Sequence, residues 1–160
     1  INRAQIEQEN KAMCDALFLR GPDAQGQWLD SEAPIALGHR RLSILDLSPA
    51  GAQPMTSDCG RYVIIFNGEI YNFAKIKNDL AAQGHDQPYK GHSDTEILLR
   101  AFSNWGVQKT IKSINGMFAI ALWDKKARIL YLARDPMGKK PLKIGWSGST
   151  LVFASEVKAL

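Results

Sequence analysis

The feature that most constrains the fold is a pair of segments, 118–123 and 129–133, that are apolar at nearly every position. Successive side chains of a β-strand point to opposite faces of a sheet, so strands of this kind are buried on both faces. The charged segment 124–128 between them predicts a turn and therefore an antiparallel hairpin. A sheet buried on both faces needs a further layer on each side.

Similar patterns predict the other elements. We expect helices at 4–18, 72–84 and 93–106, a short helical segment at 155–160, and strands at 35–37, 42–47, 62–66, 142–146 and 151–154. Asn67-Gly68 follows the buried strand 62–66 directly and is a strong turn signal. The strands come as hairpins rather than in β-α-β alternation. This order predicts an α+β sandwich of antiparallel sheets with helices outside.

Length and composition fit one continuous globular domain. The chain has 160 residues, of which 45% are hydrophobic and 22% charged, and no apolar run approaches the roughly 18 residues of a membrane span. Residues 1–10 are polar and do not resemble a signal peptide. Two cysteines, Cys14 and Cys59, are too few for a disulfide scaffold or a four-cysteine zinc site. We therefore expect a cytoplasmic protein with reduced thiols and no membrane partner.

The charge is unevenly distributed along the chain. Residues 1–107 carry a net charge of −3, whereas residues 108–160 carry +7. A basic segment of this kind indicates a nucleic-acid surface, a solvated face, or a face that docks on another domain. Its basic residues lie mostly at turns, as in 124–128, and not on one helix stripe with interleaved aromatic residues. This pattern argues against a nucleic-acid partner.

Three polar groups lie where a site could form, and each has a plain structural alternative. Arg41, with Arg40 beside it, could hold a carboxylate through its guanidinium fork, or form a surface ion pair. The segment 67–69, Asn-Gly-Glu, could form an oxyanion hole, or be an ordinary turn. Asp94 could bind an ammonium group, or complement a helix dipole. No glycine-rich phosphate loop and no metal-ligand spacing of histidines occurs.

Taken together, the segments resemble the glutamine amidotransferase domain that uses an N-terminal cysteine nucleophile, most closely that of glutamine-hydrolysing asparagine synthetases. Any one segment is a weak signal, but their order along the chain is specific. The resemblance rests on residues 20–23, 38–46, 51–55, 66–72, 93–96, 115–119, 133–142 and 154–160. It implies a four-layer α/β/β/α sandwich of the N-terminal-nucleophile hydrolase type, and residues 1–160 as one glutaminase domain.

The resemblance also implies roles for individual residues. Arg41 would bind the α-carboxylate of glutamine, Asp94 its α-ammonium, and Glu69 would help to hold the substrate amine. The Asn67 side chain and the Gly68 N–H would stabilise the tetrahedral oxyanion. The backbone near two further positions would line the same pocket, namely Ile44 and Leu45.

The sequence departs from the family at the nucleophile. The family places a cysteine at the mature N-terminus on an opening strand, whereas this sequence begins with Ile1 and leads almost directly into a helix. Neither Cys14 nor Cys59 has the motif or the free α-amine that the nucleophile needs. Leu19 replaces a histidine of the family. We therefore expect the sequence as written to lack the opening strand and the nucleophile, and to hydrolyse no glutamine.

The implied function is hydrolysis of glutamine to glutamate and ammonia, with ammonia passed to an acceptor such as aspartate. The partners would be glutamine and a C-terminal synthetase domain of the same chain. That absent domain would bind ATP and Mg²⁺, whereas this one would need no cofactor and no metal. Two alternatives remain open here: the glutaminase domain of another amidotransferase, such as glucosamine-6-phosphate synthase, or a non-catalytic interaction module that uses the basic C-terminal third.

Overall fold

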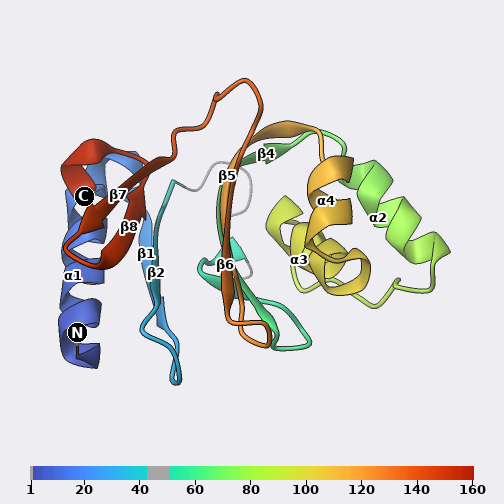
Figure 1. The fold of residues 1–160 in the computed structure, drawn as a ribbon. Coiled ribbons are helices and arrows are strands. Elements are labelled where there is room, and N and C mark those ends of the chain that lie inside the picture. Colours follow the sequence, from blue (N-terminus) through green and yellow to red (C-terminus); the bar gives the residue numbers. More distant parts are fainter. Residues whose placement is uncertain (1, 43–50) are drawn as a thin grey trace.

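The computed structural model describes residues 2–42 and 51–160, which form four layers (Figure 1). Helix α1 (Arg3–Ala16) is the first layer, and two antiparallel hairpins form the second. A four-stranded antiparallel sheet is the third layer, and three helices are the fourth. The expected four-layer α/β/β/α sandwich of antiparallel sheets is therefore confirmed.

The second layer contains the two hairpins side by side (Figure 1). In one, β1 (Ala24–Leu29) pairs with β2 (Ala36–Arg41); in the other, β7 (Lys143–Ser147) pairs with β8 (Thr150–Ala154). Helix α1 packs on β2, where an added Cβ at Gly38 would overlap the Cys14 sulfur. The even-numbered residues of β2 therefore face α1, and the odd-numbered ones face the third layer.

The third layer has the strand order β3-β4-β5-β6. Its strands are β3 (Met55–Thr56), β4 (Tyr62–Ile70), β5 (Gly116–Asp124) and β6 (Ile129–Arg134). Its outer face is covered by α2 (Phe73–Ala82), α3 (Asp94–Trp105) and α4 (Val107–Ser113). Short 3₁₀ turns follow α1 at Phe18–Arg20 and end the chain at Val157–Ala159.

Two cores hold the layers together. The larger lies between the third layer and its helices, and the smaller lies between the two sheets around Leu37, Val63 and Trp123. The space between the sheets is called the interlayer space below. The Trp123 indole N–H donates to the buried Asp30 carboxylate at 2.8 Å, which ties the β1–β2 turn to the facing sheet. The two sheets are thus joined by apolar packing and by a buried hydrogen bond.

Most of the expected elements are confirmed, but the turn expected at Asn67-Gly68 is wrong. Strand β4 continues through both residues to Ile70 and pairs with β5 along its whole length. The two backbones approach so closely that a Cβ at Gly68 would overlap the Met117 carbonyl oxygen. A glycine that the local rule assigns to a turn instead permits strand pairing, so tertiary contacts override turn propensity.

Other differences concern short or polar elements. Strands β1 and β3 and helix α4 were not expected, because none has a clear apolar period. The short strand expected at 35–37 belongs to β2, which continues to Arg41. Of the strand expected at 42–47, Leu42 lies outside any strand, and residues 43–47 lie outside the described part of the chain. Within that part, no helix is long and apolar enough to cross a membrane.

Candidate active site at the end of the facing sheets

The open edge of β4 is the side of Phe66–Ile70 that points away from β5. Backbone groups of an antiparallel strand alternate between its two neighbours. The Phe66 N–H donates to Gln53 Oε1 at 2.6 Å, and the Ile70 N–H donates to Asp94 Oδ2 at 3.0 Å. Phe66 and Ile70 therefore direct their N–H groups toward this edge, as does every second residue between them.

Gly68 lies midway between Phe66 and Ile70, and its pairing with β5 confirms that its N–H points to the open edge of β4. Its partner in β5 is Phe118, whose N–H and C=O are both engaged with Asp135 on the far side, at 3.2 and 2.8 Å. Gly68 and Phe118 therefore form a pair that exchanges no backbone hydrogen bonds. The Gly68 N–H consequently points to the open edge of β4, between the Gln53 amide and the Asp94 carboxylate.

The side chains of Asn67 and Glu69 point into the interlayer space. Phe66 and Ile70 belong to the core on the helix side, whereas Val63 belongs to the interlayer core, so odd-numbered residues of β4 face β2. Asn67 is half-buried and Glu69 is exposed at the end of the strand. An amide side chain and a carboxylate thus stand beside the Gly68 N–H.

Asp94 is fixed at the N-terminus of α3, next to this edge. Ser93 caps the helix, with its side chain accepting from the Glu96 N–H. The Ile70 N–H holds one oxygen of the Asp94 carboxylate. Burial raises the pKa of Asp94 above its usual value, and nearby Glu69 acts in the same direction. A bound cation would offset both effects, which suits the expected contact with an ammonium group.

Arg41 faces the interlayer space from the opposite sheet. It is an odd-numbered residue of β2, on the same face as Leu37 and His39. Leu37 packs in the same cluster as Val63, and His39 lies close to the Phe66 backbone. The two strands therefore advance in the same direction along the interlayer space. Arg41, two residues beyond His39, accordingly reaches the level of Asn67 to Glu69.

The segment 51–54 connects the two sides. The Arg41 guanidinium lies against Gly51, where an added Cβ would stand 2.6 Å from Nη2. Two residues on, the Gln53 amide bonds the Phe66 backbone in both directions, donating to its C=O at 3.1 Å. Segment 51–54 therefore runs from the Arg41 guanidinium on β2 to the open edge of β4.

Of the expected site residues, the structure brings Asn67, Gly68, Glu69 and Asp94 to one place and directs Arg41 toward it. Ile44 and Leu45 lie outside the described residues. Sequence reasoning gave no role to His39, Gly51 or Gln53. Only the fold shows that they contact Phe66 and Arg41, and a single sequence carries no signal for such contacts.

His39 provides a test of this interlayer packing. Burial lowers its pKa to about 4, against a hydrogen bond to the Phe66 backbone that favours the charged form. Because the unfolded chain binds the proton near pH 6.5, the free energy of unfolding should fall as pH drops from about 6.5 to about 4. The loss from this group amounts to at most roughly 3 kcal/mol.

Urea unfolding at pH 7.0 and 4.5 measures this effect. His39→Gln should flatten the pH dependence, whereas the matched change His92→Gln, at an exposed histidine, should leave it as in the parent protein. Equal slopes in the parent and in His39→Gln would contradict the burial argument.

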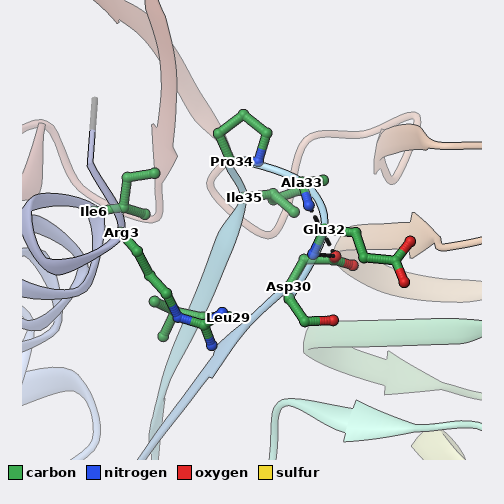
Figure 2. Close-up of a pocket in the computed structure, with 9 residues that line it drawn as sticks. Arg3, Ile6, Leu29, Asp30, Glu32, Ala33, Pro34 and Ile35 are labelled. Atoms are coloured by element: carbon green, nitrogen blue, oxygen red, sulfur yellow. Dashed lines mark hydrogen bonds between the residues drawn. The ribbon is translucent and has the colours of Figure 1, made fainter.

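Two cavities of the described residues lie elsewhere. Figure 2 shows one of about 220 Å³, between α1 and the β1–β2 turn, where the Asp30 carboxylate accepts from the Glu32 and Ala33 N–H groups. It lies at the far end of β2 from Arg41. An open groove of about 700 Å³ runs along α4 and the first residues of β4. Neither cavity includes an expected site residue.

The two cysteines do not lie at the site either. Cys14 is 4% exposed within α1, and burial raises the pKa of its thiol. Cys59 lies before β4, at the opposite end of that strand from Asn67, with its sulfur 3.3 Å from the Ser57 hydroxyl. Residues 2–42 and 51–160 contain no cluster of three histidine, cysteine or acidic side chains fit for a metal.

Comparison with known proteins gives a consistent picture. Residues 2–160 match the model of the glutamine amidotransferase domain family. The chain is 39% identical over 163 residues to glutamine-hydrolysing asparagine synthetase 3 of Bacillus subtilis, covering 99% of this chain and 26% of that protein. It is 40% identical over 157 residues to asparagine synthetase 1 of the same organism, covering 98% and 24%. The chain thus spans about a quarter of the length of these relatives.

A solved structure shares the fold. Glutamine phosphoribosylpyrophosphate amidotransferase from B. subtilis, complexed with ADP and GMP, superposes with a TM-score of 0.65 at 26% identity. The superposition covers 78% of this chain and 28% of that chain.

Proposed function

We propose that this chain, which belongs to the glutamine amidotransferase domain family, supplies the glutamine-binding and oxyanion-stabilising groups for glutamine hydrolysis at the open edge of β4 within an asparagine synthetase-like enzyme. The observation that carries the proposal is the gathering of complementary groups at one end of the interlayer space. Arg41 suits a carboxylate, Asp94 suits an ammonium, and an amide with a backbone N–H suits an oxyanion. These are the charged and reacting ends of glutamine.

In the proposed reaction a cysteine thiolate attacks the carboxamide carbon of glutamine, and negative charge develops on the carbonyl oxygen. The Asn67 side-chain amide and the Gly68 N–H donate to that oxygen. When the tetrahedral adduct collapses, the C–N bond breaks and ammonia leaves with a proton from the general base. Water then attacks the thioester, the C–S bond breaks, and glutamate leaves as the thiol re-forms.

We propose that the nucleophile is a cysteine outside residues 1–160, with its own α-amine as the base. The position of the two cysteines that the chain does contain supports this. Cys14 is buried in a helix behind β2, and Cys59 lies at the opposite end of β4 from Asn67. A thiol on a strand beside β2 would have direct access to the interlayer space.

The greater length of the related asparagine synthetases supports a proposal for where the ammonia is used. The chain matches a quarter of the length of asparagine synthetases, and we propose that a C-terminal synthetase domain of the same protein receives ammonia and transfers it to aspartate, using ATP and Mg²⁺. The glutaminase domain itself needs no cofactor. The free thiols of Cys14 and Cys59 fit a reducing compartment, so we place the protein in the cytoplasm.

Glutamate release from the full-length protein tests the proposal, with Asp94→Asn as the diagnostic variant. The asparagine can still accept from the Ile70 N–H, so the fold should persist, but the substrate ammonium loses its charged partner. We expect glutamine binding to weaken by about 2–3 kcal/mol, seen mainly as a higher KM. Asp79→Asn is the control: Asp79 is a half-buried residue in the second half of α2, where its carboxylate pairs with Lys75. No glutamate release by the parent protein, or equal KM values for parent and Asp94→Asn, would contradict the assignment.

A further inference from the structure

We propose that Gln53 is a positioning residue for glutamine hydrolysis: its carboxamide substitutes for a strand partner at Phe66 and thereby sets the Gly68 N–H at the developing oxyanion. This inference deepens the proposed function and rests on it. Gln53 itself does not touch the substrate in this scheme. It acts through the backbone of β4.

The register of β3 and β4 shows the substitution. β3 pairs with β4 only at Met55 with Ile64 and at Thr56 with Val63. Continuing that antiparallel register would bring the backbone of residue 53 opposite Phe66. The Gln53 side chain makes the contacts instead, accepting from the Phe66 N–H at 2.6 Å and donating to its C=O at 3.1 Å. Pro54 has no N–H with which to extend the ladder.

Backbone pairing of β3 with β4 therefore ends at Ile64, and the Gln53 side chain bonds Phe66, two residues before Gly68. A continuing strand would pair with the Gly68 N–H and occupy the position where an oxyanion has to bind. The carboxamide satisfies Phe66 without adding backbone, so the next N–H along the edge stays directed at the site. Gly68 has no side chain to fix it by packing. On one side β4 is fixed by its pairing with β5; on the open edge, the restraints next to Gly68 are Gln53 at Phe66 and Asp94 at Ile70.

Gln53 is itself anchored from the opposite sheet. A Cβ added at Gly26 in β1 would overlap the Gln53 carbonyl oxygen, so the segment lies directly on that strand. Two residues earlier, Gly51 lies against the Arg41 guanidinium. His39 reaches the same Phe66 backbone from β2. The segment that bonds the Phe66 backbone therefore rests on the opposite sheet, and it also contacts Arg41, so the carboxylate end and the oxyanion end of the site share one short connecting segment.

Ser57 provides a control that distinguishes an effect of Gln53 on the site from a general loss of stability. At the beginning of β4, the Ser57 hydroxyl accepts from the Tyr62 N–H at 3.0 Å, and Ser57 is 6% exposed. It is also a buried side chain that bonds the backbone of β4, but at the far end of the strand from Gly68. Ser57→Ala therefore removes a similar interaction without touching the site.

The experiment measures kcat, KM and Tm of the full-length protein with Gln53→Leu, Gln53→Glu and Ser57→Ala. Gln53→Leu removes both bonds to Phe66, and we expect kcat to fall about 10- to 100-fold while KM changes less than about threefold. Gln53→Glu keeps an acceptor for the Phe66 N–H but loses the donor to its C=O, and we expect a smaller fall. Ser57→Ala should lower Tm and leave both kinetic constants near those of the parent.

The inference would be overturned by a parental kcat in Gln53→Leu, or by an equal loss of kcat in Ser57→Ala at a matched fall in Tm. A raised KM at constant kcat would overturn it as well, since it would make Gln53 a substrate-binding residue. If the parent protein releases no glutamate, the proposed function fails. Hydrogen exchange then tests the local contact, because peptides spanning 66–70 should exchange faster in Gln53→Leu, which loses the acceptor for the Phe66 N–H, and remain protected in Ser57→Ala.

Discussion

Replacing Asn67 with alanine in the full-length protein is expected to lower kcat for glutamine hydrolysis by about 10²- to 10³-fold and to change KM little. Its side chain faces the interlayer space beside the Gly68 N–H, and in the proposed reaction the carbonyl oxygen of glutamine gains its charge there. A donor placed at that oxygen binds the transition state more strongly than the substrate. Loss of one such donor costs on the order of 3 kcal/mol in the barrier.

Asn72→Ala is the matched control for this change. The Asn72 side chain donates to the Ser113 C=O and accepts from the Asn115 N–H, both at 2.8 Å, so it joins the start of α2 to the end of α4. Its loss should lower Tm without lowering kcat. An Asn67→Ala protein with parental kcat would remove the amide from the oxyanion hole, even if the Gly68 N–H still contributed.

The part of the fold that sequence could predict is the part where local pattern and tertiary structure agree. The hairpin of β5 and β6 is apolar on both faces as expected; β5 is buried on both faces, whereas β6, at the edge of the sheet, is half-buried. The Ser93 cap and the apolar residues that follow it form α3 as expected. In such segments propensity, periodicity and burial all favour one conformation. The four layers follow from them.

The site is where local rules fail, and the failures have physical causes. Asn67-Gly68 carries a turn signal, yet β4 and β5 pair through it because a glycine allows their backbones to approach. The Gln53 carboxamide bonds Phe66 from 13 residues away, and no local pattern encodes that contact. The residue types of the site could be inferred from the family's motifs. Their supporting contacts depend on chain segments that only the fold brings together.

Gly68→Ala is expected to lower both the stability of the protein and kcat for glutamine hydrolysis. A Cβ at this position would overlap the Met117 carbonyl oxygen and stand 2.8 Å from the Phe118 Cα, and both are backbone atoms of the paired strand. Strand β4 must therefore move away from β5. Strain of this kind costs about 1–3 kcal/mol of stability. A shift that displaces the oxyanion donor by about 1 Å costs roughly another 10²-fold in kcat.

Gly145→Ala in β7 is the control, because a Cβ there meets only ordinary contacts, 3.7 Å from Leu160 and 3.8 Å from Val152. It should leave Tm and kcat close to parental values, although it is the same substitution in a strand of the same domain. Gly68→Ala should lower both. If Gly68→Ala lowered Tm but left kcat unchanged, the N–H of residue 68 would have no part in stabilising the oxyanion, and close strand approach would be the sole reason for glycine at this position.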